Sequence, residues 1–390
     1  MTNVIFELEP AEAALCRAIA ADSLISGPAA RDFIDILGNE PAFQFARSHE
    51  AASHVAHALD EDPQASEVDP RWAREHDQWE RRISRYLTEL DHVASALDHE
   101  NIPLVALKNV GIARGLHPCA GCCPMGDIDV LVAQADFPRA HDILLQLGYR
   151  FEFRSPLEEC EFLAAATTGS AEYCRILETG EELWLELQWR PVAGRWIQPD
   201  QEPRAVDLIA RSLPIQGSHA RLLSPEDNLL QVALHTAKHS YVRAPGLRLH
   251  TDVDRIVRAQ SLDWDRFLAL TTSLHVRTAT YYSLQIPRQI CGTPIPSEVC
   301  ERLAPPKLQR RQLARLMRRA GLFHPNESKF SRLEYIVFTS LLYDDLRSWR
   351  RAILPRRQWM RERYGEHATW RLPWLHVRRI ADLLFRRMST

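Results

Sequence analysis

The chain has 390 residues, of which 45% are hydrophobic and 25% are charged, as is usual for a globular protein. This composition excludes a disordered chain, a collagen or a coiled coil as a description of the whole, and the length predicts two or three domains. No apolar run approaches the roughly 20 residues of a membrane span, and the first residues do not resemble a secretory signal. With eight scattered cysteines, we expect a cytoplasmic protein with free thiols.

Charge is unevenly distributed along the chain. Residues 301–390 hold 21 lysines and arginines against 8 acidic residues, whereas the whole chain has a net charge of −3. The asymmetry indicates either an anionic partner or a set of solvated helix faces. Residues 374–387 mix apolar side chains with arginines, so peripheral membrane contact through the basic C-terminus is one interpretation, and a helix packed on its own domain is the other. No aromatic stacking platform accompanies the arginines, so a nucleic-acid partner is not expected.

Hydrophobic periodicity divides the chain into three regions. Residues 1–95 are predicted to be helical, residues 96–195 to form a small α/β core, and residues 196–390 to form a helical C-terminal domain. Within the core, the pattern predicts strands over 102–107, 128–132 and 149–153, a helix over 136–147, and a hairpin from 173–177 and 183–189. The fold class is therefore α+β, with a small mixed sheet flanked by helical N-terminal and C-terminal regions.

Three carboxylates stand out in the predicted core. Asp127 and Asp129 are two residues apart at the start of a predicted strand, and side chains alternate along a strand, so both face one side. Glu186 lies on the polar face of a later predicted strand whose other face is apolar. Paired carboxylates next to Gly126 suit Mg²⁺ with substrate phosphates, and a third acid suits a two-metal site. The alternatives are a turn-capping Asp pair and an exposed strand glutamate.

The motifs around these acids resemble a known family. The segments 105–108, 126–132 and 147–149 (Val-Ala-Leu-Lys, Gly-Asp-Ile-Asp-Val-Leu-Val and Leu-Gly-Tyr) are similar to the uncharacterised nucleotidyltransferase family of the DNA-polymerase-β-like superfamily. Further similar segments are 224–227, 252–255 and 262–265, so the resemblance extends over most of the chain.

The resemblance implies an enzyme that moves a nucleoside monophosphate from an NTP, with ATP expected, to an acceptor hydroxyl. Asp127, Asp129 and Glu186 would be catalytic and would hold Mg²⁺, while Lys108 and Gly126 would serve the phosphates. The acceptor would be a small molecule, a peptide or a protein, and a natural-product pathway is one setting that the resemblance suggests.

Three positions depart from the family pattern. Asn109 stands where the family has glycine, Cys123 where it often has arginine, and Gln188 where it usually has histidine. A helper residue for phosphate is therefore missing or comes from elsewhere. These losses motivate an alternative, a non-catalytic nucleotide-binding or interaction protein on a decayed scaffold, although the three acids are intact.

Two further clusters carry candidate ligands. His235, Lys238 and His239 share one face of a predicted helix; the resemblance places this face at the nucleotide or acceptor cleft, and a partly buried polar face is the alternative. His117, Cys119, Cys122 and Cys123 lie within seven residues. They could bind zinc, but no second pair follows at finger or ribbon spacing, so loop thiols are the favoured interpretation.

Overall fold

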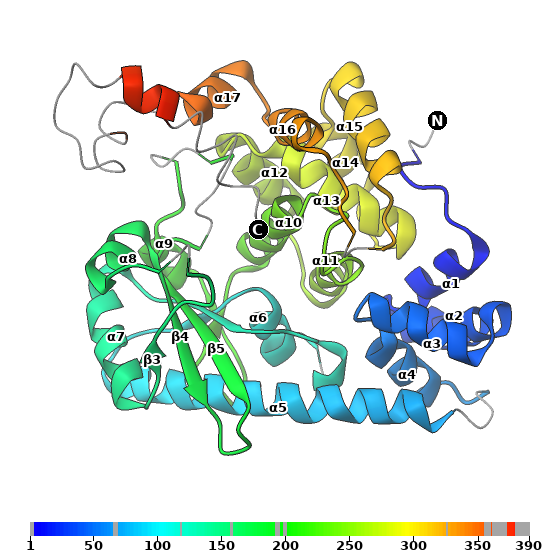
Figure 1. Cartoon of the computed structure of the whole chain (residues 1–390), viewed down its shortest axis with the longest axis horizontal. Coiled ribbons are helices and arrows are strands. Elements are labelled where there is room, and N and C mark those ends of the chain that lie inside the picture. The colour runs from blue at the N-terminus through cyan, green and yellow to red at the C-terminus, as the bar shows by residue number, and fades with distance from the viewer. Residues whose placement is uncertain are drawn as a thin grey trace.

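A computed structural model describes residues 4–64, 69–117, 119–156, 159–191, 196–197, 201–324, 327–354, 360 and 373–378. Its architecture is α+β, as the sequence predicts, with one mixed sheet and many helices (Figure 1). The helices before the sheet are α1 (Pro10–Ala18), α2 (Ser23–Leu37), α3 (Asn39–Ser48), α4 (Ala52–Asp60) and α5 (Pro70–His99). Those associated with the sheet are α6 (Lys108–Gly115), the 3₁₀ turns η1 (Ala120–Cys122) and η2 (Gln134–Asp136), α7 (Phe137–Gln146), α8 (Phe162–Thr168) and α9 (Ala205–Ala210). The helices after it are α10 (Pro225–Lys238), α11 (Arg248–Ala259), α12 (Trp264–Ser273), α13 (Arg277–Ile290), α14 (Ser297–Leu303), α15 (Lys307–Ala320), α16 (Arg332–Ser340) and α17 (Leu346–Ile353).

The described strands form a single sheet in the order β3-β4-β5-β2-β1-β7-β6. They are β1 (Val105–Ala106), β2 (Ile128–Leu131), β3 (Arg150–Phe151), β4 (Ser170–Ile176), β5 (Glu182–Gln188), β6 (Leu213–Pro214) and β7 (Arg221–Leu222). β4 and β5 make the predicted hairpin, and β5 then pairs in parallel with β2, whereas β1 and β2 are antiparallel. The sheet is therefore mixed, and β2 lies at its centre.

The long helix α5 covers one face of the sheet. Asp69 caps its N-terminus through the Arg71 amide, and Pro70 occupies the first turn, where its missing N–H costs nothing. The buried residues of its second half recur at helical spacing and pack with α7 and with the inward side chains of β2 and β5. α5 thus connects the sheet to the N-terminal helices at its other end (Figure 1).

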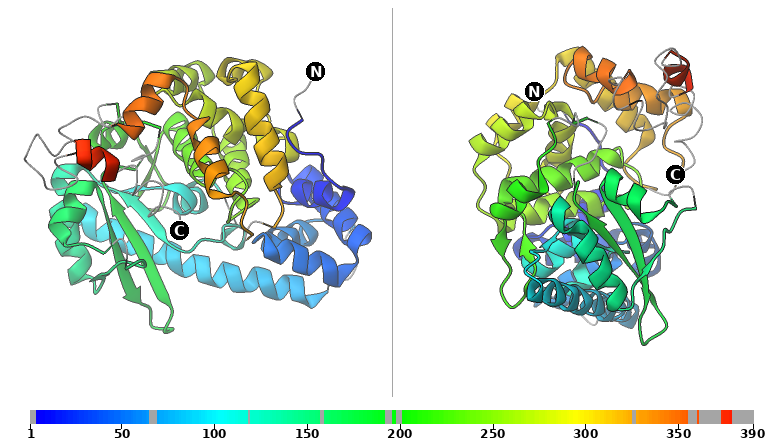
Figure 2. Two further views of the ribbon diagram at one scale, coloured as in Figure 1. Left: turned by 45° about the horizontal axis from the view of Figure 1, so that its top comes forward. Right: turned by 90° about the vertical axis from the view of Figure 1, so that its left-hand side faces the viewer.

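Helices α1–α4 share their hydrophobic core with the C-terminal helices rather than with the sheet. Buried side chains from both ends of the chain, such as Leu15 and Tyr282, belong to one cluster. Polar contacts join the same regions: the Ile5 amide donates to Gln289 at 2.8 Å and the Ala21 amide to Asp254 at 2.7 Å. Figure 2 shows the N-terminal helices lying against the helices that follow the sheet. The N-terminal and C-terminal helices therefore share one hydrophobic core.

The proposed boundaries at residues 95 and 195 remain predictions. α5 runs past residue 95 without a break, and the sheet also takes strands β6 and β7 from beyond residue 195. Within the described ranges, no helix combines the length and apolar character that crossing a membrane requires. Most of the basic segment 374–387 lies outside the described residues.

Candidate functional site

Strands β2 and β5 bring two of the candidate carboxylates together. Their parallel register places Asp129 directly opposite Glu186. Ile128, Val130 and Leu185 are buried in the core shared with α5, so alternation sends the two acids to the opposite face of the sheet. The structure therefore brings Asp129 and Glu186 together on one face of the sheet.

Lys108 lies between these two acids. Its Nζ is 2.6 Å from Oδ1 of Asp129 and 3.9 Å from Oε2 of Glu186. Lys108 is the first residue of α6 and has a φ of +49°, a left-handed conformation that is uncommon for a residue with a side chain. Its amide donates to Oε1 of Gln231 on α10 at 3.3 Å, which ties this turn to the C-terminal helices.

The two members of this ion pair have perturbed proton affinities. Burial raises the pKa of Asp129 to about 6, with the Lys108 ammonium acting against this shift and Glu186 adding to it. For Lys108, burial acts to lower the pKa, but the charges of Asp129 and Glu186 outweigh it and the pKa rises. The lysine is therefore a permanent cation that partly offsets the clustered negative charge.

Gln188 supplies a second contact to Asp129. Its Nε2 donates to Oδ1 at 2.8 Å, and both side chains are buried. This is the position at which the family usually has histidine. The amide still serves as a hydrogen-bond donor that orients the carboxylate, so the substitution keeps a contact to Asp129.

Asp127 immediately precedes β2 and has a different partner. Nη2 of Arg154 lies 2.7 Å from its carboxylate and 3.1 Å from that of Glu172, and the guanidinium lies over the Trp184 ring. Asp127 also contributes to the raised pKa of Lys108, so all three acids act on the same ammonium. Arg154 was not found from the sequence, because it lies in a loop after β3 and no motif spacing marks it.

Gly126 is exposed, and a Cβ added there would meet no atom within 4 Å. The fold itself therefore imposes no steric requirement for glycine at this position. A ligand that approaches the backbone closely would impose one.

Helix α10 carries His235, Lys238 and His239 and packs against α6, the helix that begins at Lys108. His235 is half-buried, and burial together with the charges of Lys108, Lys238 and Arg248 lowers its pKa well below the ordinary value. Its ring centroid lies 4.7 Å from that of His239, and Lys238 is exposed at the end of the helix. The expected grouping of His235, Lys238 and His239 is thus present, with neutral imidazoles among lysine and arginine side chains.

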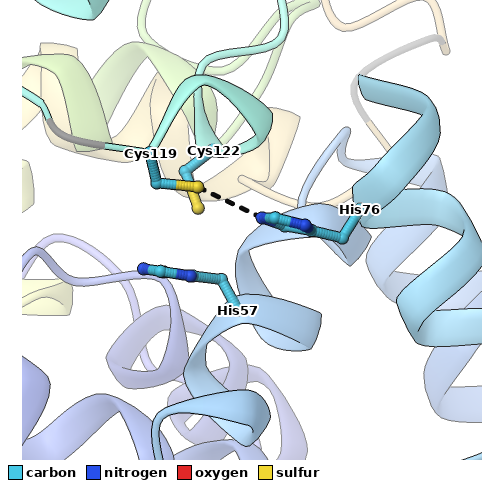
Figure 3. A group of neighbouring side chains, drawn as sticks. All are labelled: His57, His76, Cys119 and Cys122. Carbon is cyan, nitrogen blue, oxygen red and sulfur yellow. Dashed lines mark hydrogen bonds between the residues drawn. The ribbon is translucent and has the colours of Figure 1, made fainter. Parts of the chain in front are cut away.

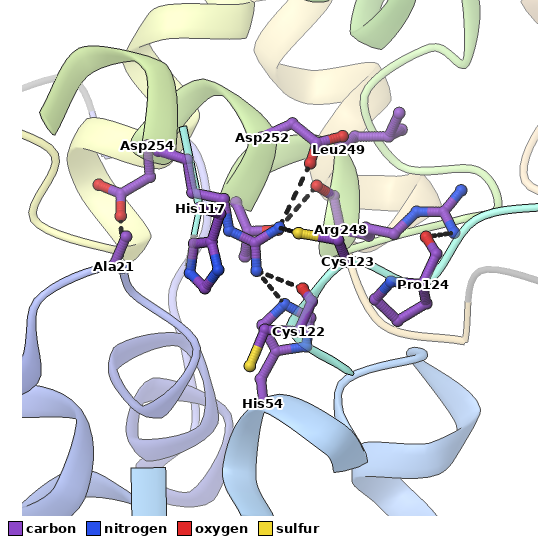
Figure 4. A network of polar contacts seen from close by, with 12 residues as sticks. Ala21, His54, His117, Cys122, Cys123, Pro124, Arg248, Leu249, Asp252 and Asp254 are labelled. Carbon is purple, nitrogen blue, oxygen red and sulfur yellow. Dashed lines mark hydrogen bonds and ion pairs between the residues drawn. The ribbon is translucent and has the colours of Figure 1, made fainter. Parts of the chain in front are cut away.

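Two arginines of α11 hold the loop that leads into β2 (Figure 4). Arg248 donates to the carbonyl oxygen of Pro124 and pairs with Glu50 at 2.7 Å. The buried Arg255 donates to the carbonyl oxygen of Cys122 and contacts Sγ of Cys123 at 3.3 Å. Arg255 belongs to the family-like segment 252–255, but neither arginine was assigned a partner from the sequence, because each is more than a hundred residues from the loop that it contacts.

The donor set fits a hard divalent cation. Asp127, Asp129 and Glu186 offer carboxylate oxygens, the ligand type that Mg²⁺ prefers. The Lys108 ammonium already lies between the carboxylates of Asp129 and Glu186, where a cation offsets their negative charge. These three acids would hold the metal.

A cavity lies elsewhere, among residues of the C-terminal half of the chain. It has a volume of about 650 Å³ and is lined by Gln201, Thr272, His275, Arg277, Asp344, Asp345, Arg347, Ser348 and Arg351. None of the three carboxylates lines it. Size alone does not identify a reaction centre, and the perturbed ion-pair cluster on the sheet is the better candidate.

Comparison with known proteins identifies the family of the chain. Residues 39–292 match the family described as uncharacterised nucleotidyltransferase, and this range includes the carboxylates, Lys108, α10 and α11. No curated protein and no solved structure matches the chain. Family membership implies nucleotidyl transfer as the kind of reaction and an NTP as substrate. The chain belongs to the uncharacterised nucleotidyltransferase family.

Proposed function

We propose that this protein transfers a nucleoside monophosphate from ATP to a hydroxyl of a small molecule, a peptide or a protein, with release of pyrophosphate. The observation that carries the proposal is the pairing of Asp129 with Glu186 across β2 and β5, with Asp127 at the start of β2 and Lys108 between them. Paired acids on neighbouring strands can hold the two metal ions that stabilise the attacking and leaving oxygens of an in-line phosphoryl transfer.

Asp127, Asp129 and Glu186 would hold Mg²⁺, which when bound neutralises phosphate charge and lowers the pKa of an attacking hydroxyl. Gln188 keeps the Asp129 carboxylate oriented through its 2.8 Å hydrogen bond. Glu186 faces the same side of the sheet and is more accessible than Asp129, with 23% of its side chain exposed against 6%. We assign Glu186 to the acceptor side for this reason.

The cations of α6, α10 and α11 are suited to the triphosphate. Lys108, Lys238 and Arg248 each help to lower the pKa of His235, and we assign these three cations to the triphosphate. An ammonium contacts phosphate as a point charge, and an arginine does so through a planar fork. Arg154, which already contacts Asp127, stands in for the arginine that the family pattern has at the position of Cys123.

The decisive experiment combines the purified chain with each of the four NTPs, Mg²⁺ and pooled hydroxyl acceptors, and measures pyrophosphate release. We expect release with ATP that depends on the acceptor and on Mg²⁺, and that disappears in Asp129→Asn. Asp142→Asn, which changes an exposed carboxylate on α7 of the same core, is the matched control and should retain activity. Mg²⁺-dependent ATP binding without turnover across the acceptor pool would favour the non-catalytic alternative.

A further inference from the structure

A second group of metal-ligand side chains lies apart from the three carboxylates. Side chains of His57, His76, Cys119 and Cys122 converge so that one donor atom from each lies within 4.8 Å of all the others (Figure 3). His57 comes from α4 and His76 from α5, whereas Cys119 precedes the η1 turn and Cys122 is its last residue. Two sulfur and two nitrogen donors are the ligand set of a tetrahedral zinc centre.

One pair of donor atoms already lies close to the separation that a bound zinc ion requires. Zinc bonds of about 2.3 Å to sulfur and about 2.0–2.1 Å to nitrogen set neighbouring donors of a tetrahedron about 3.3–3.8 Å apart. Nε2 of His76 already lies 3.1 Å from Sγ of Cys119. In Figure 3, His76 points a ring nitrogen at the sulfur atom of Cys119, and the His57 ring lies beside the two sulfur atoms with its plane at 9° to that of His76.

The turn that carries the cysteines is shaped for this approach. Cys119 and Cys122 are separated by two residues, the second of which is Gly121. A Cβ on Gly121 would lie 2.8 Å from Nε2 of His76, closer than real Cβ atoms come, so only glycine lets the ring reach the sulfurs. The close approach of His76 therefore depends on the residue at position 121.

Other helices fix the backbone of the turn. Ser53 on α4 donates to the carbonyl oxygen of Gly121 at 2.6 Å, and Arg255 donates to that of Cys122. A carboxylate for orienting an imidazole is also present, because Oε1 of Glu61 lies 3.3 Å from Nε2 of His57. The protein thus supplies both the donors and the supporting contacts.

The cluster differs from the one suggested by local spacing. His117 turns to the backbone of Cys119, with Nδ1 at 3.2 Å from the carbonyl oxygen, and Cys123 contacts Arg255 instead. Their places are taken by two histidines from the N-terminal helices, about 60 and 40 residues earlier in the chain. Spacing within one segment therefore could not identify the full ligand set.

We propose that His57, His76, Cys119 and Cys122 bind one structural zinc ion. Four protein donors close the tetrahedron and leave no open position for substrate, so the role is structural rather than catalytic. The ion connects α4 and α5 to the loop that leads into β2, a few residues before Asp127. It therefore anchors the segment that delivers the candidate active-site acids.

The test measures metal content on the full chain, purified without a histidine tag. Mass spectrometry of the metal should find one zinc per chain, and cobalt added after chelation should give the absorption of a tetrahedral ion with two thiolates. Cys122→Ser and His76→Asn should weaken zinc affinity by more than about 100-fold, since loss of outer-shell partners alone costs roughly 10–100-fold. Cys160→Ser and His92→Asn, the latter on the same helix as His76, are matched controls that should retain zinc.

Two further measurements distinguish the zinc site from the carboxylate site and from a failure to fold. Asp127→Asn should retain zinc, because that carboxylate belongs to the other site; loss of zinc there would overturn the assignment. If the cysteine variant does not fold, cobalt titration of the unmodified chain still decides the question. Absence of both zinc and the thiolate–cobalt absorption, or a Cys119–Cys122 disulfide in the purified protein, would refute the proposal.

Discussion

Replacing Lys108 with methionine tests the electrostatic account of the carboxylate cluster. The Asp129 side chain is only 6% exposed, and the ammonium 2.6 Å away is its main counter-charge. Removing one partner of a buried ion pair costs about 3–5 kcal/mol. The Gln188 hydrogen bond remains, and the lysine side chain is 17% exposed. We therefore expect the metal-free chain to lose about 3 kcal/mol of unfolding free energy, at the lower end of that range.

Mg²⁺ should reverse most of this loss. In the variant no ammonium competes with the ion, so binding to the folded state alone would add about 2.7 kcal/mol at a concentration 100 times the dissociation constant. The unmodified chain should gain less, because Lys108 must move first. Urea unfolding with and without Mg²⁺ measures both effects.

Lys307→Met, at an exposed position on α15, is the control and should change stability by less than about 0.5 kcal/mol. If Lys108→Met behaves like this control, or if Mg²⁺ stabilises the variant no more than the unmodified chain, the proposed competition between lysine and metal is wrong.

Three further outcomes follow from the site and its surroundings. Asp127→Asn and Asp129→Asn should each reduce transfer by about 100-fold or more, matching the several kcal/mol that a metal supplies to the transition state; near-normal turnover in both would remove the catalytic assignment. Glu186→Gln should reduce turnover far more than ATP affinity, because an acceptor-side ligand acts chiefly in the transition state; equal losses in kcat and binding would argue against that role. His250 is buried with Nε2 donating to the Tyr241 carbonyl at 2.9 Å, and burial lowers its pKa from 6.5 to about 4. The folded state therefore binds fewer protons than the unfolded state, so stability is full above pH 6.5 and falls by about 3 kcal/mol towards pH 4. His250→Gln should flatten this part of a stability–pH curve, and an unchanged slope would contradict the buried neutral state.

Much of the core could be predicted from local patterns. The alternation in 128–132 and 183–189 predicts which side chains face the core shared with α5, and the observed register places Asp129 opposite Glu186 on the other face of the sheet. The Ser224-Pro225 pair likewise predicts where α10 begins. These features depend on residues that are neighbours in the sequence or share one strand.

The missed contacts all join distant segments. Arg154 reaches Asp127 from a loop, and Arg248 reaches Pro124 from α11. His57 and His76 meet the Cys119–Cys122 turn only because α4 and α5 pack against it. Such contacts depend on how the helices and loops pack in the folded protein. Hydrophobic periodicity in a single sequence predicts helices and strands, but it does not predict which of them pack together.

The most direct test of the central claim is a titration of Mn²⁺, as a spectroscopic substitute for Mg²⁺, into the chain with a non-hydrolysable ATP analogue. Electron paramagnetic resonance reports free Mn²⁺, so the bound ion is counted without knowing the acceptor. The account predicts nucleotide-dependent Mn²⁺ binding that is lost in Asp129→Asn and retained in Asp142→Asn. Equal Mn²⁺ and nucleotide binding by the Asp129→Asn variant and the unmodified chain would contradict it.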